Sequence, residues 1–171
     1  MKKVDIVKFI CFGGILTAMA VIFQSAPVFL PALGMAFSPL STLPIAIAAA
    51  SNIILGLFVL ISSTLILTLV SIEETFILLF TSGLLGIMIG IFLYRSSIVI
   101  SILLSSIALS LGMMFLTYIV GFPAFVDITA SLSTLVTLLI FFLFSLTYAS
   151  IWNICFKKFM NYLIKVKLIS K

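Results

Sequence analysis

The fold depends on residues 40–70, which read LSTLPIAIAAASNIILGLFVLISSTLILTLV. This apolar run is too long for one ordinary membrane crossing, which takes about 20 residues. A polar pair, Ser51 and Asn52, lies near its middle. We therefore predict that the chain folds back at this pair and forms two spans, over residues 40–50 and 53–70.

The rest of the chain is similarly apolar. Of its 171 residues 64% are hydrophobic and 8% are charged, and the mean hydropathy is +1.51. A soluble domain is roughly 45–50% apolar and 25% charged, so a water-soluble globule is excluded. We predict one all-α domain, residues 1–171, that forms an integral membrane bundle of six transmembrane helices. The other four spans are expected at residues 7–25, 75–94, 97–120 and 129–156, followed by a basic tail at 157–171.

The amino-terminal region allows two readings. Its basic start and long apolar run resemble a secretory signal, but the run exceeds the usual length and Pro27 disfavours cleavage after Ala26. We therefore treat it as the first span. From Ala26 to Pro44 the chain carries five helix-breaking residues, at positions 27, 31, 34, 39 and 44. Because proline removes backbone donors, this stretch is expected to be a loop.

The charges set the expected orientation. The chain has nine Lys and Arg residues and four Asp and Glu residues, which give a net charge of +5. Most of the basic residues lie in the two tails. With six spans and an internal amino terminus, Arg95 and the lysine tail are cytoplasmic, as basic residues tend to be. The carboxylates of Glu73, Glu74 and Asp127 are then external. One span fewer would export Arg95 and the carboxy-terminal lysines, so we predict six spans with both termini cytoplasmic.

The composition also excludes several functions. The chain has no histidine, which removes imidazole acid–base chemistry and His-ligated metal or haem sites. No span holds a carboxylate pair or a nucleophile beside a base, so we do not expect an enzyme. No basic face is available for nucleic acid. We expect no cofactor and no metal site; metal binding by the carboxylates alone is conceivable only for hard cations, because His is absent and no Cys is near.

Small residues recur at four-residue spacing in three predicted spans. They are Gly14 and Ala18 in the first, Ser82, Gly86 and Gly90 in the fourth, and Ser101 and Ser105 in the fifth. Such faces let helices approach closely, either inside the bundle or against another protein. Gly14 and Ala18 are the best candidates for a docking face, because they lie in the cytoplasmic half of a helix beside the basic tail.

The order of these sequence features along the chain resembles that of a known family. The features that carry the resemblance are GGILTAMA at 13–20, the proline-rich first external loop, PIAIAAASN at 44–52 and EETFILLFTSGLLGIMIGIFLYR at 73–95. They resemble the S component, the substrate-binding membrane subunit of energy-coupling-factor (ECF) transporters, and related uncharacterised membrane proteins of spore-forming bacteria.

The resemblance implies a subunit of the bacterial cytoplasmic membrane that binds a vitamin-like solute from outside. In that family a small pair in the first helix docks on a transmembrane coupling subunit, which would map onto Gly14 and Ala18, with glycine in place of the usual first alanine. A separate ATPase pair supplies the energy. No GxxxxGK[ST] motif occurs here, so ATP hydrolysis would fall to those partners.

External polar residues are then the candidates for solute binding. They are Gln24, Glu73, Glu74, Tyr118 and Asp127. A negative outer mouth favours a cationic or neutral solute. The alternative is helix capping, since acidic residues favour helix amino termini. Asn52 is expected to satisfy backbone groups at the fold-back, and Asn153 to lie at the inner membrane interface. The rival to the importer subunit is a membrane scaffold or assembly protein that transports no solute.

Overall fold

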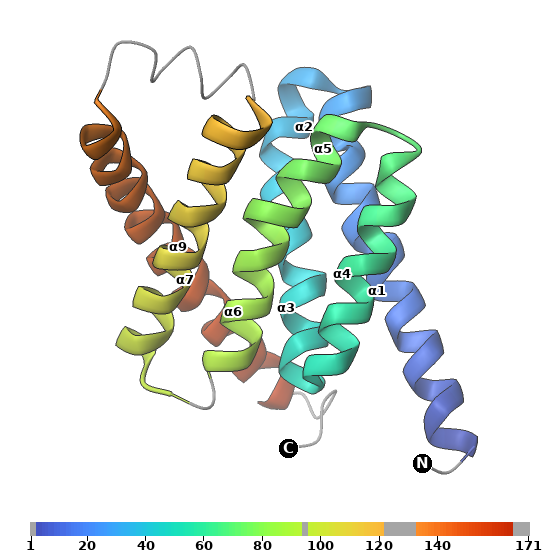
Figure 1. The fold of residues 1–171 in the computed structure, drawn as a ribbon. Coiled ribbons are helices and arrows are strands. Elements are labelled where there is room, and N and C mark those ends of the chain that lie inside the picture. Colours follow the sequence, from blue (N-terminus) through green and yellow to red (C-terminus); the bar gives the residue numbers. More distant parts are fainter. Residues whose placement is uncertain (1–2, 94–95, 122–132, 166–171) are drawn as a thin grey trace.

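The computed structural model describes residues 3–93, 96–121 and 133–165, and its regular elements in these ranges are all helices (Figure 1). The predicted all-α class is confirmed. Five helical runs are long and apolar enough to cross a membrane, and a sixth apolar helix, residues 53–68, is shorter. The chain is therefore a multi-pass helical membrane protein. In chain order the elements are α1 (Lys3–Phe29), α2 (Pro31–Phe37), the 3₁₀ turn η1 (Ser38–Ser41), α3 (Thr42–Ser51), α4 (Ile53–Thr68), α5 (Ile72–Ile77), the π-helical turn η2 (Leu78–Ser82), α6 (Gly83–Phe92), α7 (Ile98–Phe115), the π-helical turn η3 (Leu116–Val120) and α9 (Thr134–Lys165).

The helix breaks at Asn52, where the sequence placed the fold-back. Asn52 is extended, with φ −159° and ψ 130°. Its side-chain oxygen accepts a hydrogen bond of 2.8 Å from the backbone N–H of Ile54. This is an N-cap, which satisfies one of the free donors at the start of α4. Because of this break, α3 and α4 pack against each other as neighbours.

The two ends of the bundle carry opposite charge. The start of α1 and the end of α9 lie at the same end, and α5 lies at the other (Figure 1). We call the first the basic end, because Lys8, Lys157 and Lys158 are exposed there. The second is the acidic end, which carries Glu73 and Glu74 in the first turn of α5. Arg95 and Asp127 lie outside the described residues.

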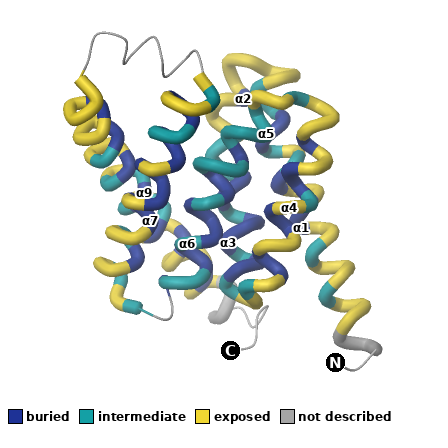
Figure 2. The backbone as a smooth tube through the Cα atoms, in the orientation of Figure 1, coloured by how far each residue is buried: buried dark blue, intermediate teal, exposed yellow. Residues whose placement is uncertain are grey.

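Helix α3 lies at the centre of the bundle and packs against α1, α4 and α6. Its residues Ile45, Ala46, Ala48 and Ala49 are at most 3% exposed. Alanines leave room for neighbouring backbones, which is how helices associate where lipid supplies no hydrophobic drive. Helices α7 and α9 form a second pair that joins through α6. Many large apolar residues are exposed, and exposed positions occur on all the long outer helices (Figure 2), as a lipid-facing surface requires.

The proline-rich stretch is helical, so the predicted loop from Ala26 to Pro44 is wrong. Helix α1 continues through Pro27 to Phe29, and Pro31 begins α2. Pro39 lies at the start of η1, and Pro44 lies in the first turn of α3. The first N–H groups of a helix have no partner within it, so proline costs little there. The prolines divide this region into short helices.

The described helices extend beyond several of the predicted spans, and the first and sixth spans show the longest extensions past their predicted ends. The first was expected to end at residue 25, but α1 reaches Phe29. The sixth was expected to end at residue 156, but α9 runs on to Lys165, with Met160 still buried. Lys157 and Lys158 are exposed on this continuous helix. The start of the basic tail is therefore the last part of α9.

Candidate functional site

A polar cluster centred on Gln24 lies at the acidic end. The Gln24 side chain is 0% exposed. Its amide nitrogen donates to Ser38 Oγ at 2.9 Å and to Glu74 Oε2 at 2.7 Å. Its carbonyl oxygen accepts from Ser41 Oγ at 2.7 Å and, weakly, from Ser82 Oγ at 3.4 Å. A glutamine amide offers two donors and a carbonyl oxygen with two lone pairs, so every hydrogen-bonding position of Gln24 is used.

Four helical segments, from two distant parts of the sequence, meet at this cluster. Gln24 lies near the end of α1, and the two serines of η1 are three residues apart, which places them on one side of a 3₁₀ turn. Glu74 follows Ser71, whose side chain caps α5 by accepting from the Glu74 N–H at 3.3 Å. Ser82 is the last residue of η2. The amide therefore ties α1, η1, α5 and η2 together.

The two neighbouring glutamates have different surroundings. Glu73 is exposed, whereas Glu74 is only partly exposed and accepts the Gln24 hydrogen bond. Neither forms an ion pair with any residue in the described part of the chain. Both lie in the first turn of α5, where the helix dipole favours negative charge. The predicted capping role therefore fits the position of Glu73, while Glu74 also belongs to the Gln24 cluster.

The structure brings together only part of the predicted solute-binding set. Gln24 and Glu74 are in direct contact. Tyr118 is 50% exposed on η3, and no contact joins it to this cluster. Asp127 lies outside the described residues. Ser38 and Ser41 were not predicted as part of the site, because hydroxyls in a stretch expected to be a loop give no signal that they face α1.

Two of the three small-residue stripes pack inside the bundle. A Cβ added to Gly86 would lie 2.9 Å from the Thr42 carbonyl oxygen, and one added to Gly90 would lie 2.6 Å from that of Ala46. This stripe therefore packs against α3. In the stripe on α7, the Ser101 hydroxyl donates to Asn153 Oδ1 on α9 at 2.6 Å.

The interfacial position expected for Asn153 is wrong. Its side chain is 0% exposed, and its amide nitrogen donates to the Ala149 carbonyl at 2.8 Å. A buried amide beside a serine stripe links two helices, and no pattern near the carboxy-terminal lysines distinguished it from an interfacial amide. Asn153 therefore belongs to the α7–α9 interface.

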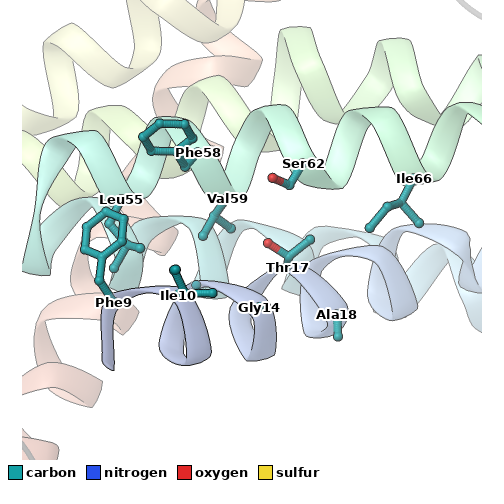
Figure 3. Close-up of a pocket in the computed structure, with 11 residues that line it drawn as sticks. Phe9, Ile10, Gly14, Thr17, Ala18, Leu55, Phe58, Val59, Ser62 and Ile66 are labelled. Carbon is teal, nitrogen blue, oxygen red and sulfur yellow. The ribbon is translucent and has the colours of Figure 1, made fainter. Parts of the chain in front are cut away.

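The third stripe, on α1, is open. Gly14 and Ala18 are exposed, and a Cβ added to Gly14 would meet no atom within 4 Å. Both residues lie on a groove of about 480 Å³ between α1 and α4 (Figure 3). Its lining is Phe9, Ile10, Gly13, Gly14, Thr17, Ala18, Leu55, Phe58, Val59, Ser62 and Ile66. The groove is largely apolar, and neither Gln24 nor Glu74 lines it.

A smaller apolar hollow of about 330 Å³ lies between α6 and α7. Gly112 lines it, and any Cβ there would collide with the Phe80 carbonyl of η2. The π turn thus brings its main chain directly onto α7, so Gly112 is required for packing. Among the described residues, no group of three His, Cys, Asp or Glu side chains is placed to hold a metal ion.

Comparison with protein-family models, with curated proteins and with solved structures gives no match to this chain. The functional inference therefore depends on the geometry of the Gln24 cluster and of the open stripe on α1.

Proposed function

We propose that this chain is the substrate-specific membrane subunit of an ECF-type importer. It binds a small cationic or neutral, vitamin-like solute at the acidic end and docks through α1 on a transmembrane coupling subunit. A partner ATPase pair provides the energy. The proposed location is the bacterial cytoplasmic membrane, with both termini in the cytoplasm.

The observation that carries the proposal is the difference between the small-residue stripes. The stripes on α6 and α7 are occupied by α3 and α9, and only the Gly14–Ala18 stripe stays open among the three. Small residues that face lipid gain nothing from close packing within the chain. An open stripe on the first helix supports docking of another helix there.

The charge distribution supports the proposed direction of binding. Exposed lysines gather at the basic end and the described carboxylates of α5 at the other. Basic ends of membrane proteins remain in the cytoplasm, so the acidic end faces outward in this proposal. Carboxylates without ion-pair partners attract cations and repel anions, which supports a cationic or neutral solute.

One observation favours the alternative, a membrane scaffold without a solute. The amide of Gln24 is already saturated by protein partners. It can bind a solute only by exchanging one of these hydrogen bonds. A scaffold would keep this cluster as a permanent brace and would use the open stripe on α1 for assembly alone.

Mass spectrometry of the gently solubilised chain separates the two functions. The importer subunit retains a small molecule and co-purifies with a membrane subunit and an ATPase pair. Gly14→Leu should release those proteins and keep the small molecule, because the added side chain enters open space. The scaffold retains proteins but no small molecule, and no vitamin or cation shifts its thermal unfolding. If Gly14→Leu lost both the partner proteins and the small molecule while its thermal unfolding was unchanged, the proposal of separate docking and solute sites would be contradicted.

A further inference from the structure

Two hydroxyl groups face the groove between α1 and α4. Thr17 comes from α1 and is 7% exposed, and Ser62 comes from α4. Both side chains extend into the space between the two helices (Figure 3). Neither hydroxyl has a hydrogen-bond partner in residues 3–93, 96–121 or 133–165. Thr17 is therefore a nearly buried polar side chain that is aimed into an apolar groove without a partner.

Neighbouring hydroxyls on α4 are satisfied within their own helix. Ser63 donates to the Val59 carbonyl at 2.6 Å, and Thr64 donates to the Ile61 carbonyl at 2.8 Å. Any helical serine or threonine can bond backward in this way. Thr17 and Ser62 differ from them because their hydroxyls face the groove. In the hydrocarbon region of the membrane a polar group without a partner is unfavourable. A molecule that occupies the groove can supply the hydrogen-bond acceptor that the Thr17 and Ser62 hydroxyls lack.

The depth of these hydroxyls identifies the chemistry of the occupant. Thr17 lies midway along the apolar run Ile6–Phe29, far from either lipid headgroup region. An acyl chain fills an apolar groove but accepts no hydrogen bond. A transmembrane helix accepts one through a main-chain carbonyl or a polar side chain, and Gly14, whose Cβ position is open, lets its backbone come close. From Phe9 to Ala18 the groove spans about 14 Å of helix, a contact of two to three turns.

A second copy of this chain fits the groove less well. In a two-fold dimer the same surface meets itself, so an axis that passes through the groove would place two concave grooves face to face and leave a void. Voids forfeit the packing contacts on which membrane helices rely. A repeated head-to-tail contact between copies closes into a ring only for particular rotations between them. A single convex helix of another protein fills the groove.

We propose that the groove between α1 and α4 binds one transmembrane helix of a different membrane protein, which accepts hydrogen bonds from Thr17 and Ser62. This inference depends on the docking part of the proposed function and is independent of whether a solute is carried. It assigns to Thr17 and Ser62 the polar contacts of an interface whose close approach is provided by Gly14.

Site-specific photo-crosslinking in the native host tests the occupant. Benzoylphenylalanine replaces Ile10, an exposed residue on the groove, and in a control it replaces Leu143, which is exposed on α9. The expected result is an adduct from position 10 that maps to a transmembrane helix of another membrane protein and is absent from position 143. Adducts with lipid alone, or with a second copy of this chain, would overturn the proposal.

Hydroxyl removal tests the hydrogen bonds. At limiting expression, Thr17→Val and Ser62→Ala should each lower the yield of this adduct about threefold, and together about tenfold, as expected for interhelical hydrogen bonds in membranes. The matched variants Thr64→Val and Ser63→Ala remove hydroxyls that bond within α4 and should leave the yield unchanged. Thermal unfolding of each variant reports whether the chain is folded.

The outcomes separate this inference from the proposed function. If the Thr17→Val, Ser62→Ala double variant gave an undiminished yield of adduct, the role of the hydroxyls would be overturned. Docking on α1 would still be supported. The opposite result has two parts: the unsubstituted chain forms the adduct but retains no small molecule, and the double variant forms ten times less adduct. This result would support the inference and refute the importer.

Discussion

Replacing Gln24 with leucine should strongly destabilise the bundle. The substitution keeps the approximate size of the side chain but removes four hydrogen-bond contacts. Each of the two short serine bonds is worth about 0.6 kcal/mol in a membrane protein. The bond to the Glu74 carboxylate contributes about 1.5–3 kcal/mol, and the 3.4 Å contact contributes little. We expect the free energy of unfolding to fall by about 3 kcal/mol.

The assay is reversible unfolding in mild detergent or bicelles with increasing denaturant, followed by circular dichroism. Asn161→Leu is the control, because it removes an amide that is exposed on α9, and it should change stability by less than about 0.5 kcal/mol. A double-mutant cycle with Glu74→Ala, which removes the acceptor, measures the coupling between Gln24 and Glu74. If Gln24→Leu were as stable as Asn161→Leu, the cluster would not brace the four segments that it joins.

Three further predictions use the same unfolding measurement. Gly90→Ala should cost about 1–3 kcal/mol, because the added methyl group meets the main chain of α3 and overpacks the core; Gly14→Ala should cost less than about 0.5 kcal/mol, and equal losses would mean that the stripe on α1 is also packed. Asn52→Ala should cost about 1 kcal/mol through loss of the α4 cap, and Asn52→Ser should recover most of it; no recovery would show that capping is not the role of this side chain. Asn153→Leu should cost about 1–2 kcal/mol, because it leaves the buried Ser101 hydroxyl without its partner; an unchanged stability would contradict an interhelical role for this amide.

The sequence predicted an all-α membrane bundle because this class depends on composition and on the length of the apolar runs. A break at Asn52 follows from a polar pair inside a run too long for one crossing. The proline-rich region could not be read in this way. Proline is unfavourable inside a helix but suits the start of a new one; here α1 continues through Pro27, whereas Pro31 begins α2, and the sequence does not show where each helix begins.

The candidate site was only partly predictable, because contacts between distant segments have no local signal. Gln24 and Glu74 were both chosen as outer polar residues, but their pairing depends on how α1 and α5 pack. The small-residue stripes were ambiguous for the same reason. Spacing identifies a face that allows close approach, whereas only the packed structure shows that Gly90 meets α3 and that Gly14 meets nothing.

The central claim is that the chain crosses the membrane an even number of times with its basic end in the cytoplasm. Labelling of single cysteines by a membrane-impermeant maleimide in intact cells tests it, after Cys11 and Cys155 are replaced. We expect Glu73→Cys to be labelled from outside, and Ser97→Cys to be labelled only after the membrane is opened. Labelling of position 97 in intact cells, with position 73 protected, would invert the bundle and contradict both the proposed outer binding site and the cytoplasmic basic end.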